Sequence, residues 1–456
     1  MSTLVIKFGG NVLGSESGIH DALKVIASQR PIWDNLIVVT SALSGVTDAL
    51  HDIVQTAEGG DQNAVRTEIA HLRALHTDAA RYALGNTQQQ EALLRELDNL
   101  FFDLLDDYEI IRQKRQAQPA LADRVAAMGE RLITRIVAAA ARAQNQKCVA
   151  LDATSIIVTD DRHSNARPIF NLSKHNIEQN LMPLLVHKII PVVTGYIGAT
   201  QQGAITTLGR GGSDYSATYL GALLSADEIW LFTDVDGLMS ADPAVVKEAR
   251  VLSTSSYAEV AEMAYFGARV LHPRAVEPLI QYNIPLRIRS IAHTDTPGTY
   301  ICDYTPPRDH RIHAVTEVDA VMIAGPSQSN IAEACNRLLS QYLLDEIQPT
   351  LQVEAHSNSL LVYIAPTNAN RAAFNNCIYQ IKTYESGDEW QVTEVVVIAV
   401  IGNLQLEDYV NVLRSLTSIE ITPLAFGQGP DNVLLIAVTQ EQSQTALTRI
   451  HSLIVR

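Results

Sequence analysis

Short apolar runs alternate with longer segments of helical spacing through roughly the first 290 residues of the chain. The apolar runs predict strands over Leu4–Lys7, Leu36–Thr40, Lys147–Leu151, Ile189–Thr194, Glu228–Thr233 and Pro285–Ile288. The intervening patterns predict helices over His20–Ser28, Ser44–Ala57, Leu121–Ala143, Ile177–His187, Asp214–Leu224 and Tyr257–Phe266. Strands that alternate with helices are typical of a three-layer α/β domain with a largely parallel sheet. We assign this domain to residues 1–293.

Residues 61–116 interrupt this alternation. They show Leu and Ala at helical spacing and no strand signal, so they predict a helical insertion. Two roles stay open for it: a cover over a functional site, or a packing element without a function of its own.

Residues 294–311 are polar and rich in Pro and Gly, and predict a linker between domains. Shorter elements follow it in an order that occurs twice over residues 312–456, which indicates two α+β modules of βαββαβ type. The expected elements are Ala320–Ala324, Ile331–Tyr342, Thr350–Glu354 and Leu360–Ile364, then Thr393–Ile401, Leu406–Ser415, Ile419–Pro423, Val433–Val438 and Ser443–His451.

The composition is that of an ordinary globular protein, with 456 residues, 47% apolar and 18% charged. A net charge of −16 disfavours nucleic acids and anionic membrane surfaces as partners. A phosphate site in such a protein needs local backbone amides, a few placed cations and a divalent metal ion. The sequence shows no signal peptide and no apolar run long enough to span a membrane, so we expect a cytoplasmic protein.

Lys7, Gly9 and Gly10 follow the first predicted strand, at the sheet edge where ligands bind in open α/β folds. Glycine lets a backbone approach a phosphate closely, and a nearby lysine supplies a point charge. By itself this pattern fits a tight turn at least as well.

A second glycine-rich segment, Gly209–Asp214, precedes a predicted helix and contains Arg210. Its free amides and guanidinium suit a carboxylate or phosphate, with Ser213 or Asp214 as the helix N-cap. A capped surface loop is the alternative. A third segment ends a strand with Thr233, Asp234 and Asp236, which favours ribose or metal binding and an ordinary turn about equally.

These segments occur in one order with further motifs, and together they resemble the aspartate kinase branch of the amino-acid kinase family over most of residues 2–302. The further motifs are Val39–Thr47, Met128–Arg131, Val193–Gly198 and Phe266–Pro273. The resemblance implies the three-layer amino-acid kinase fold, followed by paired ACT-like domains. It also implies ATP-dependent phosphorylation of the side-chain carboxylate of L-aspartate to 4-phospho-L-aspartate, the first step toward lysine, threonine and methionine.

The resemblance also implies roles for individual residues. Lys7 would neutralise the γ-phosphoryl oxygens, oriented by Asp214, with the phosphate loops formed by Gly9, Gly10, Gly211 and Gly212. The amino acid would contact Ser41, Thr47, Glu130, Arg210 and Ser213, with Glu130 on its ammonium and Arg210 on its α-carboxylate. ATP would contact Lys7, Thr233, Asp234, Met239, Asp242 and Arg269. The chemistry implies Mg²⁺, without a dedicated set of protein ligands.

The sequence departs from the family pattern at Asn11-Val12, Met239, Ala244 and Arg269. Because Lys7, Arg210, Asp214 and Glu130 are retained, we expect altered nucleotide affinity or rate rather than lost activity. ACT-like modules imply an amino-acid effector, although the site is expected to be reduced or absent, and a homodimer or higher homo-oligomer.

Two other functions stay open at this point. One is a kinase for another amino-acid carboxylate, such as glutamate or an aspartate analogue. The other is a non-catalytic sensor of nucleotide or amino acid.

Overall fold

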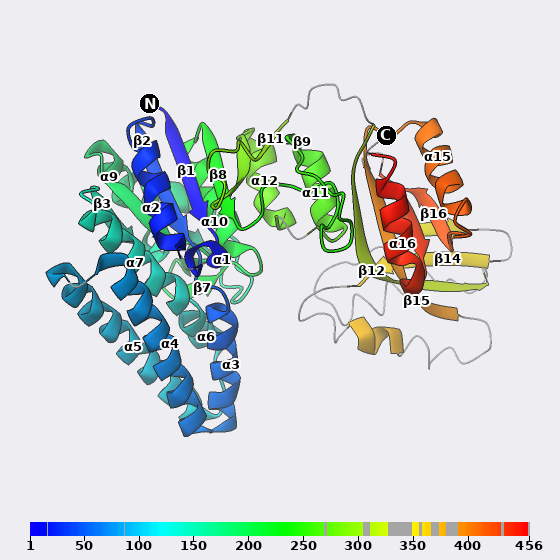
Figure 1. Cartoon of the computed structure of the whole chain (residues 1–456). Helices are drawn as coiled ribbons and strands as arrows, with labels where there is room; N and C mark the ends of the chain where they lie inside the picture. Colours follow the sequence, from blue (N-terminus) through cyan, green and yellow to red (C-terminus); the bar gives the residue numbers. More distant parts are fainter. Residues whose placement is uncertain are drawn as a thin grey trace. The chain divides into compact units, whose positions relative to one another are not determined.

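The computed structural model describes residues 1–15, 17–85, 87–268, 271–303, 311–326, 349–354, 358–365, 374–379, 391–429 and 433–454. Contacts divide the chain into two compact units (Figure 1). The first unit is formed by Met1–Leu238, Ser253–Tyr257 and Leu271–Thr305, and the second by Met239–Leu252, Ala258–Val270 and Pro306–Arg456. Two segments within residues 1–293 therefore group with the C-terminal part of the chain. Within the described ranges, no helix is both long and apolar enough to cross a membrane.

The first unit is built on an eight-stranded sheet with the order β3-β5-β2-β1-β8-β10-β11-β9. All six predicted strands occur in it and run parallel: β1 (Thr3–Phe8), β2 (Asn35–Thr40), β3 (Cys148–Leu151), β5 (Ile190–Thr194), β8 (Glu228–Thr233) and β10 (Leu286–Ser290). The sheet is completed by β11 (Thr299–Cys302), antiparallel to β10, and β9 (Thr254–Ser256). Strand β11 lies inside the segment predicted as a linker. A small second sheet contains β4 (Val158–Thr159), β6 (Ile197–Thr200) and β7 (Ile205–Thr207).

Helices cover both faces of the large sheet, which confirms the three-layer prediction. Alternate residues of β1 face opposite ways, and Leu4, Ile6 and Phe8 pack into a core with α2 (Gly18–Gln29) and α7 (Met128–Ala143). The other face of β1 contacts α10 (Gly212–Leu224), which packs on α12 (Pro273–Tyr282). Lys7 therefore lies on the face covered by α10.

Two predicted helices are each broken in the structure. The helix predicted over 121–143 is divided at Ala127 into α6 (Pro119–Ala126) and α7. The start of α7 brings Gly129 so close to the loop after β2 that an added Cβ would lie 2.7 Å from Cβ of Ala42. The helix predicted over 177–187 is divided at Leu181 into α8 (Phe170–Asn180) and α9 (Met182–Val186). Pro183 suits the start of a helix and not its interior, because it has no amide hydrogen.

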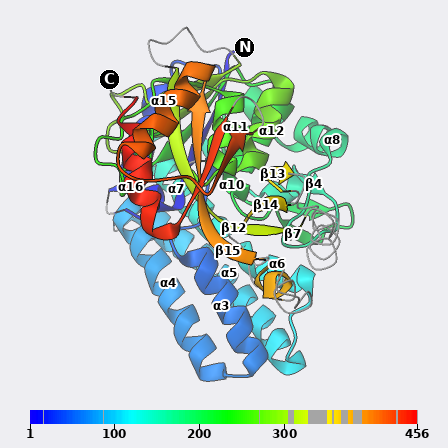
Figure 2. The same ribbon diagram turned by 90° about the vertical axis from the view of Figure 1, so that its right-hand side faces the viewer.

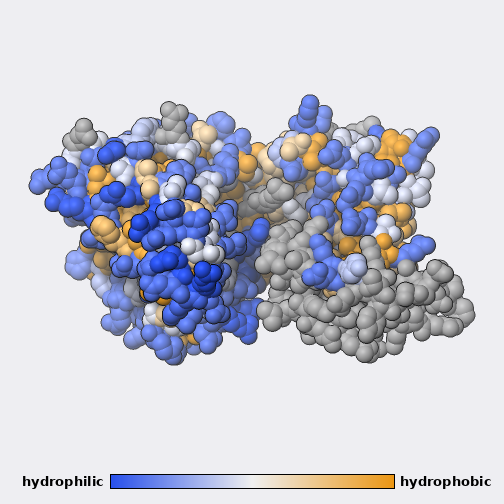
Figure 3. Space-filling view, turned by 90° about the horizontal axis from the view of Figure 1, so that it is seen from below, coloured by the Kyte–Doolittle hydropathy of each residue, from blue (hydrophilic) through white to orange (hydrophobic). Residues whose placement is uncertain are grey.

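The insertion at 61–116 contains two long helices, α4 (Gln62–Leu84) and α5 (Gln88–Lys114), which follow α3 (Val46–Gly59). Figure 2 shows α3, α4 and α5 side by side, and α4 and α5 both contact α7. Their apolar residues join the core beneath the sheet. Figure 3 shows that the outer surface on the side of these helices is mostly hydrophilic. The hairpin therefore supports α7.

His76 is a buried histidine in α4 and makes this hairpin sensitive to acid. Its Nδ1 donates to the carbonyl oxygen of Leu72 at 2.7 Å, and its ring packs against Phe101. Burial lowers the pKa of His76 to about 4, whereas the unfolded chain titrates near 6.5. Protonation therefore favours the unfolded state as the pH falls from about 6.5 toward 4, and no further below that. Because of His76, we expect the free energy of unfolding to fall by about 2 kcal/mol when the pH is lowered from 6.5 to 5.

The measurement is urea unfolding at pH 6.5 and pH 5 for the wild-type protein and for His76→Leu. The variant should lose less stability on acidification. His71→Leu is the matched control, because His71 lies on the same helix with its side chain 71% exposed. Equal acid sensitivity of all three proteins would contradict the assignment.

The second unit is built on a six-stranded antiparallel sheet with the order β13-β14-β12-β15-β17-β16. The strands are β12 (Ile312–Pro326), β13 (Leu351–Glu354), β14 (Asn358–Ile364), β15 (Gln391–Gly402), β16 (Ala425–Gln428) and β17 (Leu434–Val438). Pairing of β12 with β15 joins the two predicted modules in one sheet, on which α16 (Gln440–His451) packs beside α15 (Leu406–Thr417).

The strand predicted over 419–423 is wrong. Helix α15 ends just before it, Glu420 has a left-handed φ of 61°, and the amide of Ile421 bonds back to the Leu416 carbonyl. The strand in this region is β16. The helix predicted over 331–342 lies outside the described residues.

Residues 239–252 are part of the second unit's core. The Ser240 hydroxyl lies 2.9 Å from Nε2 of His451 in α16, and the Ser240 carbonyl accepts the amide of Val315 in β12 at 2.8 Å. Ala241 and Val246 pack in one apolar cluster with residues of both elements. This segment thus depends on the C-terminal part of the chain for its packing.

Candidate active site

The carboxyl ends of the central parallel strands lie together at one edge of the first unit's sheet. Phe8 in β1 pairs with Thr40 in β2 and with Phe232 in β8, and Thr40 pairs with Thr194 in β5. The loops that follow these strands therefore meet at one place. Most of the site residues predicted from sequence lie in these loops or in helices that begin beside them.

Lys7 and Asp214 form an ion pair at this edge. The Lys7 Nζ is 2.6 Å from a carboxylate oxygen of Asp214, and their side chains are only 12% and 19% exposed. Asp214 lies in the first turn of α10 and is not its N-cap; the cap position is held by Gly211, which has a left-handed φ of 69°. The prediction that Ser213 or Asp214 caps this helix is therefore wrong. The pairing leaves Asp214 well placed to orient the lysine.

The glycines after β1 lie in a tightly packed turn. The amide of Gly9 donates to the Phe232 carbonyl at 3.1 Å. A Cβ at Gly10 would lie 2.5 Å from the Ala42 carbonyl oxygen, so no larger residue fits without movement of the backbone. Gly10 begins the short helix α1 (Gly10–Leu13), whose Val12 is buried.

Asn11, one of the departures from the family pattern, has a specific partner. Its side-chain amide donates to Asp234 at 3.0 Å, and the Thr233 hydroxyl donates to the other carboxylate oxygen at 3.0 Å. Partial burial would raise the pKa of Asp234, but these two hydrogen bonds outweigh it and the pKa is lowered. The loop after β1 is thereby tied to the turn after β8. Sequence reasoning missed this link because only the fold brings residues 11 and 234 together.

Asp236 in the same turn has a different partner. The ring of His293 lies 2.6 Å from its carboxylate in an exposed pair, and this contact lowers the pKa of Asp236.

Glu130 is a buried carboxylate whose charge is only partly compensated. It lies in the first turn of α7, where one oxygen accepts the amide of Ala42 at 3.1 Å. The other oxygen, Oε2, is buried and has no hydrogen-bond partner among the described residues. Burial raises the pKa of Glu130 to about 8, opposed by the Ala42 amide and by the positive charge of Lys7. A buried carboxylate with one free oxygen is a site that favours a cationic ligand group.

Arg210 lies in a loop shaped by glycines with left-handed backbone, Gly209 (φ 79°) and Gly211 (φ 69°). Gly211 packs on His272, where an added Cβ would lie 2.4 Å from the histidine Cβ. His272 caps α12, because its Nδ1 accepts the amide of Arg274 at 3.3 Å. His272 therefore has a structural role in this loop.

The other predicted amino-acid contacts lie around this loop. Ser213 packs against Gly195, directly after β5. The amide of Ser41, directly after β2, donates to the Phe8 carbonyl at 3.2 Å. Thr47 is half-buried in the first turn of α3. Ser41 thus directly follows β2, and Glu130 bonds to the main chain one residue later. Ser213 packs against the residue that follows β5.

Three predicted ATP contacts lie outside the described residues of the first unit. Met239 and Asp242 belong to the second unit, where the Asp242 carboxylate accepts the amide of Ala244 at 2.8 Å. Arg269 lies outside the described residues.

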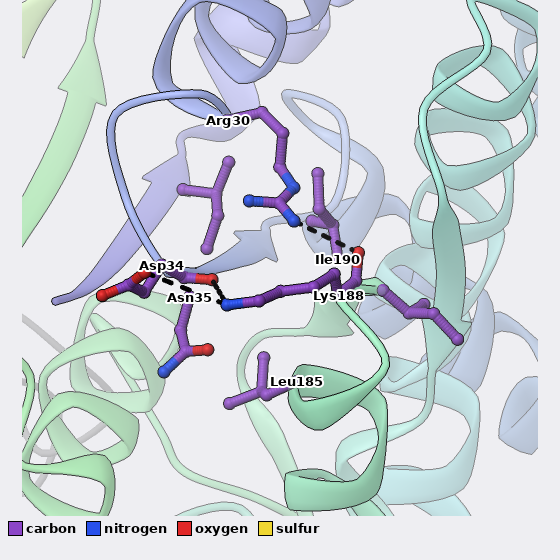
Figure 4. A pocket seen from close by; sticks show the side chains of 8 residues that line it. Arg30, Asp34, Asn35, Leu185, Lys188 and Ile190 are labelled. Carbon is purple, nitrogen blue, oxygen red and sulfur yellow. Dashed lines mark hydrogen bonds and ion pairs between the residues drawn. The ribbon is translucent and has the colours of Figure 1, made fainter. Parts of the chain in front are cut away.

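A hollow at the opposite edge of the sheet is lined by both polar and apolar residues (Figure 4). Its cations are already satisfied within the protein: Lys188 donates to the Asp34 carbonyl at 3.0 Å, and Arg30 bonds to two main-chain carbonyls. Figure 4 shows both side chains pointing toward their partners. The described residues that line the hollow therefore leave no cation for a ligand, and the Lys7–Asp214 pair and Glu130 lie at the other edge.

Residues 2–290 match the sequence profile of the amino acid kinase family. The chloroplastic bifunctional aspartokinase/homoserine dehydrogenase 2 of Arabidopsis thaliana is 37% identical over 306 residues, which cover 67% of this chain and 32% of that protein. The aspartokinase of Chlamydia muridarum is 32% identical over 301 residues, covering 66% of this chain and 63% of that protein. The chain thus spans about a third of the plant relative's length and less than two thirds of the bacterial one.

Among solved structures, the E. coli aspartokinase III in complex with aspartate and ADP superimposes with a TM-score of 0.82. The match covers 100% of both chains at 22% sequence identity. It shows the same fold through both units, including the ACT-like modules.

Proposed function

The chain belongs to the amino acid kinase family, and we propose that it transfers the γ-phosphoryl group of ATP to the side-chain carboxylate of L-aspartate. The relatives named as aspartokinases and the aspartate and ADP held by the E. coli enzyme support this proposal. The observation that carries it is the free, buried oxygen of Glu130 in a site that also contains the Lys7–Asp214 pair. A carboxylate that favours an ammonium group beside a cation that favours a phosphoryl group suits an amino-acid kinase.

In this proposal the amino acid lies among the loops at the carboxyl edge of the sheet. Its ammonium pairs with Oε2 of Glu130 and its α-carboxylate with the guanidinium of Arg210, with Ser41, Thr47 and Ser213 around it. Lys7, held by Asp214, neutralises the oxygens of the phosphoryl group during transfer. The attacking group is already a carboxylate, so no general base is required. Catalysis then depends on positioning and charge neutralisation.

The nucleotide phosphates would contact the amides of Gly9 and Gly10, with Thr233 and Asp234 as further ATP contacts in the same unit. Among the described residues there is no group of three or more acidic, histidine or cysteine side chains that would hold a metal by themselves. Mg²⁺ is usually held mostly by substrate phosphates and water, with one or two carboxylates. Asp234 is the carboxylate in the turn after β8 that suits this role. When bound, Mg²⁺ would neutralise charge on the β- and γ-phosphates.

We also propose that the second unit keeps a reduced amino-acid effector site and that the chain forms a homodimer or higher homo-oligomer. The support is its fold, shared over both units with the E. coli enzyme. Sedimentation at micromolar concentration and inhibition assays with lysine and threonine test the two parts. A stable monomer would remove the first part, and unchanged rates would remove the second.

The test of the reaction is incubation with Mg-ATP and a panel of amino acids, with any acyl phosphate trapped by hydroxylamine. Turnover with aspartate alone supports the proposal. Preference for glutamate or an aspartate analogue would assign a different carboxylate kinase. Binding without turnover would leave a sensor.

Aspartate binding is expected to release about one proton at pH 7 from the Glu130 carboxyl group. Without a ligand, burial raises the pKa of Glu130 to about 8, so this group is mostly protonated at pH 7. Pairing with an ammonium requires the ionised form. Affinity should therefore rise about tenfold per pH unit up to pH 8 and then level off.

Calorimetric titrations in buffers of different ionisation enthalpy measure the released protons. Glu130→Gln should abolish the buffer dependence of any residual binding. A binding enthalpy for the wild-type protein that is independent of the buffer would contradict this assignment.

A further inference from the structure

Arg274, in the first turn of α12, contacts three separate parts of the chain with one guanidinium group. Its Nη1 donates to the carbonyl of Leu208 at 3.0 Å and to the side chain of Asn165 at 2.5 Å. Its Nη2 donates to the carbonyl of Ala166 at 3.1 Å, and the guanidinium lies over the ring of Tyr215, 5.1 Å from its centre. Arg274 therefore joins the loop before α8, the Arg210 loop and the first turn of α10.

Asn165 extends this contact to the next residue of the Arg210 loop. It lies so close to Gly209 that an added Cβ there would be 2.8 Å from its side-chain oxygen. Gly209 has a left-handed φ of 79°, which few other residues adopt readily. The oxygen that packs on Gly209 is the one that accepts from Arg274. The guanidinium thus fixes the loop through Leu208 directly and through Gly209 indirectly.

The residues just before the loop are held by a buried carboxylate. Asp123, whose side chain is 2% exposed, accepts the amide of Thr207 at 3.1 Å and its hydroxyl at 2.8 Å. The same carboxylate holds Ser164 and His163. The amide of Leu208 donates to the Tyr196 carbonyl at 2.8 Å. Residues 207–209 are therefore bonded on several sides, and Arg274 adds contacts to Leu208 and, through Asn165, to Gly209.

We propose that Arg274 is a positioning residue for amino-acid binding, which holds the backbone of residues 208–212 so that Arg210 is preorganised for the substrate α-carboxylate. The inference rests on the proposed function for the identity of the substrate. The planar fork of arginine donates to two carbonyls and one amide oxygen at fixed angles, which a lysine ammonium does not reproduce. Loss of this fork allows the loop to sample other conformations before substrate binds, and preorganisation is lost.

The kinetic test compares the wild-type protein with Arg274→Lys and Arg274→Met. The KM for aspartate should rise about tenfold in Arg274→Lys and further in Arg274→Met, with the KM for ATP changed less than about threefold. The control is Arg287→Lys, because Arg287 also pairs with a side chain, Glu228, and also stacks on an aromatic ring, that of Tyr300. The control should leave both KM values unchanged. Equal changes in the two KM values of Arg274→Lys would overturn the inference.

Hydrogen exchange of the amides in residues 207–214 provides a readout that does not depend on activity. Both Arg274 variants should exchange faster in this segment, by about tenfold or more, while Arg287→Lys should not. Unchanged exchange would overturn the inference whatever the substrate is. If the wild-type protein does not turn over aspartate, the proposed function fails, and the exchange rates still decide whether Arg274 orders the loop. Faster exchange with an unchanged aspartate KM in an active enzyme would also overturn it.

Discussion

Replacing Lys7 with methionine is expected to lower kcat about a thousandfold, equivalent to about 4 kcal/mol of transition-state stabilisation. Methionine keeps most of the length of the side chain and removes its charge. In the proposed reaction, the ammonium opposes negative charge that builds up on the transferring phosphoryl group. The loss should fall on kcat more than on the KM for aspartate, because Lys7 acts on the phosphoryl group.

The rate is measured by hydroxamate trapping at saturating Mg-ATP and aspartate. Lys188→Met is the matched control, since Lys188 bonds to Asp34 at the opposite edge of the sheet and should keep full activity. Circular dichroism checks that Lys7→Met is folded. A folded variant with more than a tenth of the wild-type kcat would remove Lys7 from the reaction.

Glu130→Gln is expected to raise the KM for aspartate about a hundredfold or more, because truncating one partner of a buried charged pair costs about 2–5 kcal/mol. Glutamine keeps the acceptor for the Ala42 amide and loses the negative charge that pairs with an ammonium. The free protein should be as stable as the wild type or more so at pH 7, because burial raises the pKa of Glu130 to about 8 and glutamine removes the cost of protonating this group on folding. Binding and stability therefore change in opposite directions.

The KM values for aspartate and ATP and the thermal midpoint are measured together. Glu228→Gln is the control, because Glu228 pairs with Arg287 at the start of β8 and should affect stability without affecting aspartate binding. A loss of stability in Glu130→Gln with an unchanged aspartate KM would show that the residue is structural.

The sequence predicts the large sheet well because each central strand is a short apolar run with its own signal. Lys7, Glu130 and Arg210 were identified through local motifs and the resemblance of those motifs to a family. The helix breaks at Ala127 and Leu181 were missed because apolar residues continue through both positions. In each case a tertiary contact or the geometry of a proline decides where the helix stops.

Sequence patterns do not predict contacts between distant parts of the chain. Asn11 and Asp234 are 223 residues apart, and Arg274 is 109 residues from Asn165. Neither pair has a sequence spacing that predicts the contact, because the contact forms only when β1, β8 and α12 pack in the folded protein. The cap of α10 was assigned wrongly for the same reason: Asp214 bonds to Lys7, more than 200 residues earlier, instead of to its own helix.

The two units each consist of three chain segments in alternation, so the chain crosses between them at five junctions. This arrangement limits how evolution or protein engineering can recombine regulatory parts among relatives. A single genetic crossover near residue 305 would join a new C-terminal sheet to segments 239–252 and 258–270 of the old protein. Ser240 and Val246 would then have to fit a foreign α16 and β12. Viable hybrids should therefore inherit all three segments of the second unit from one parent.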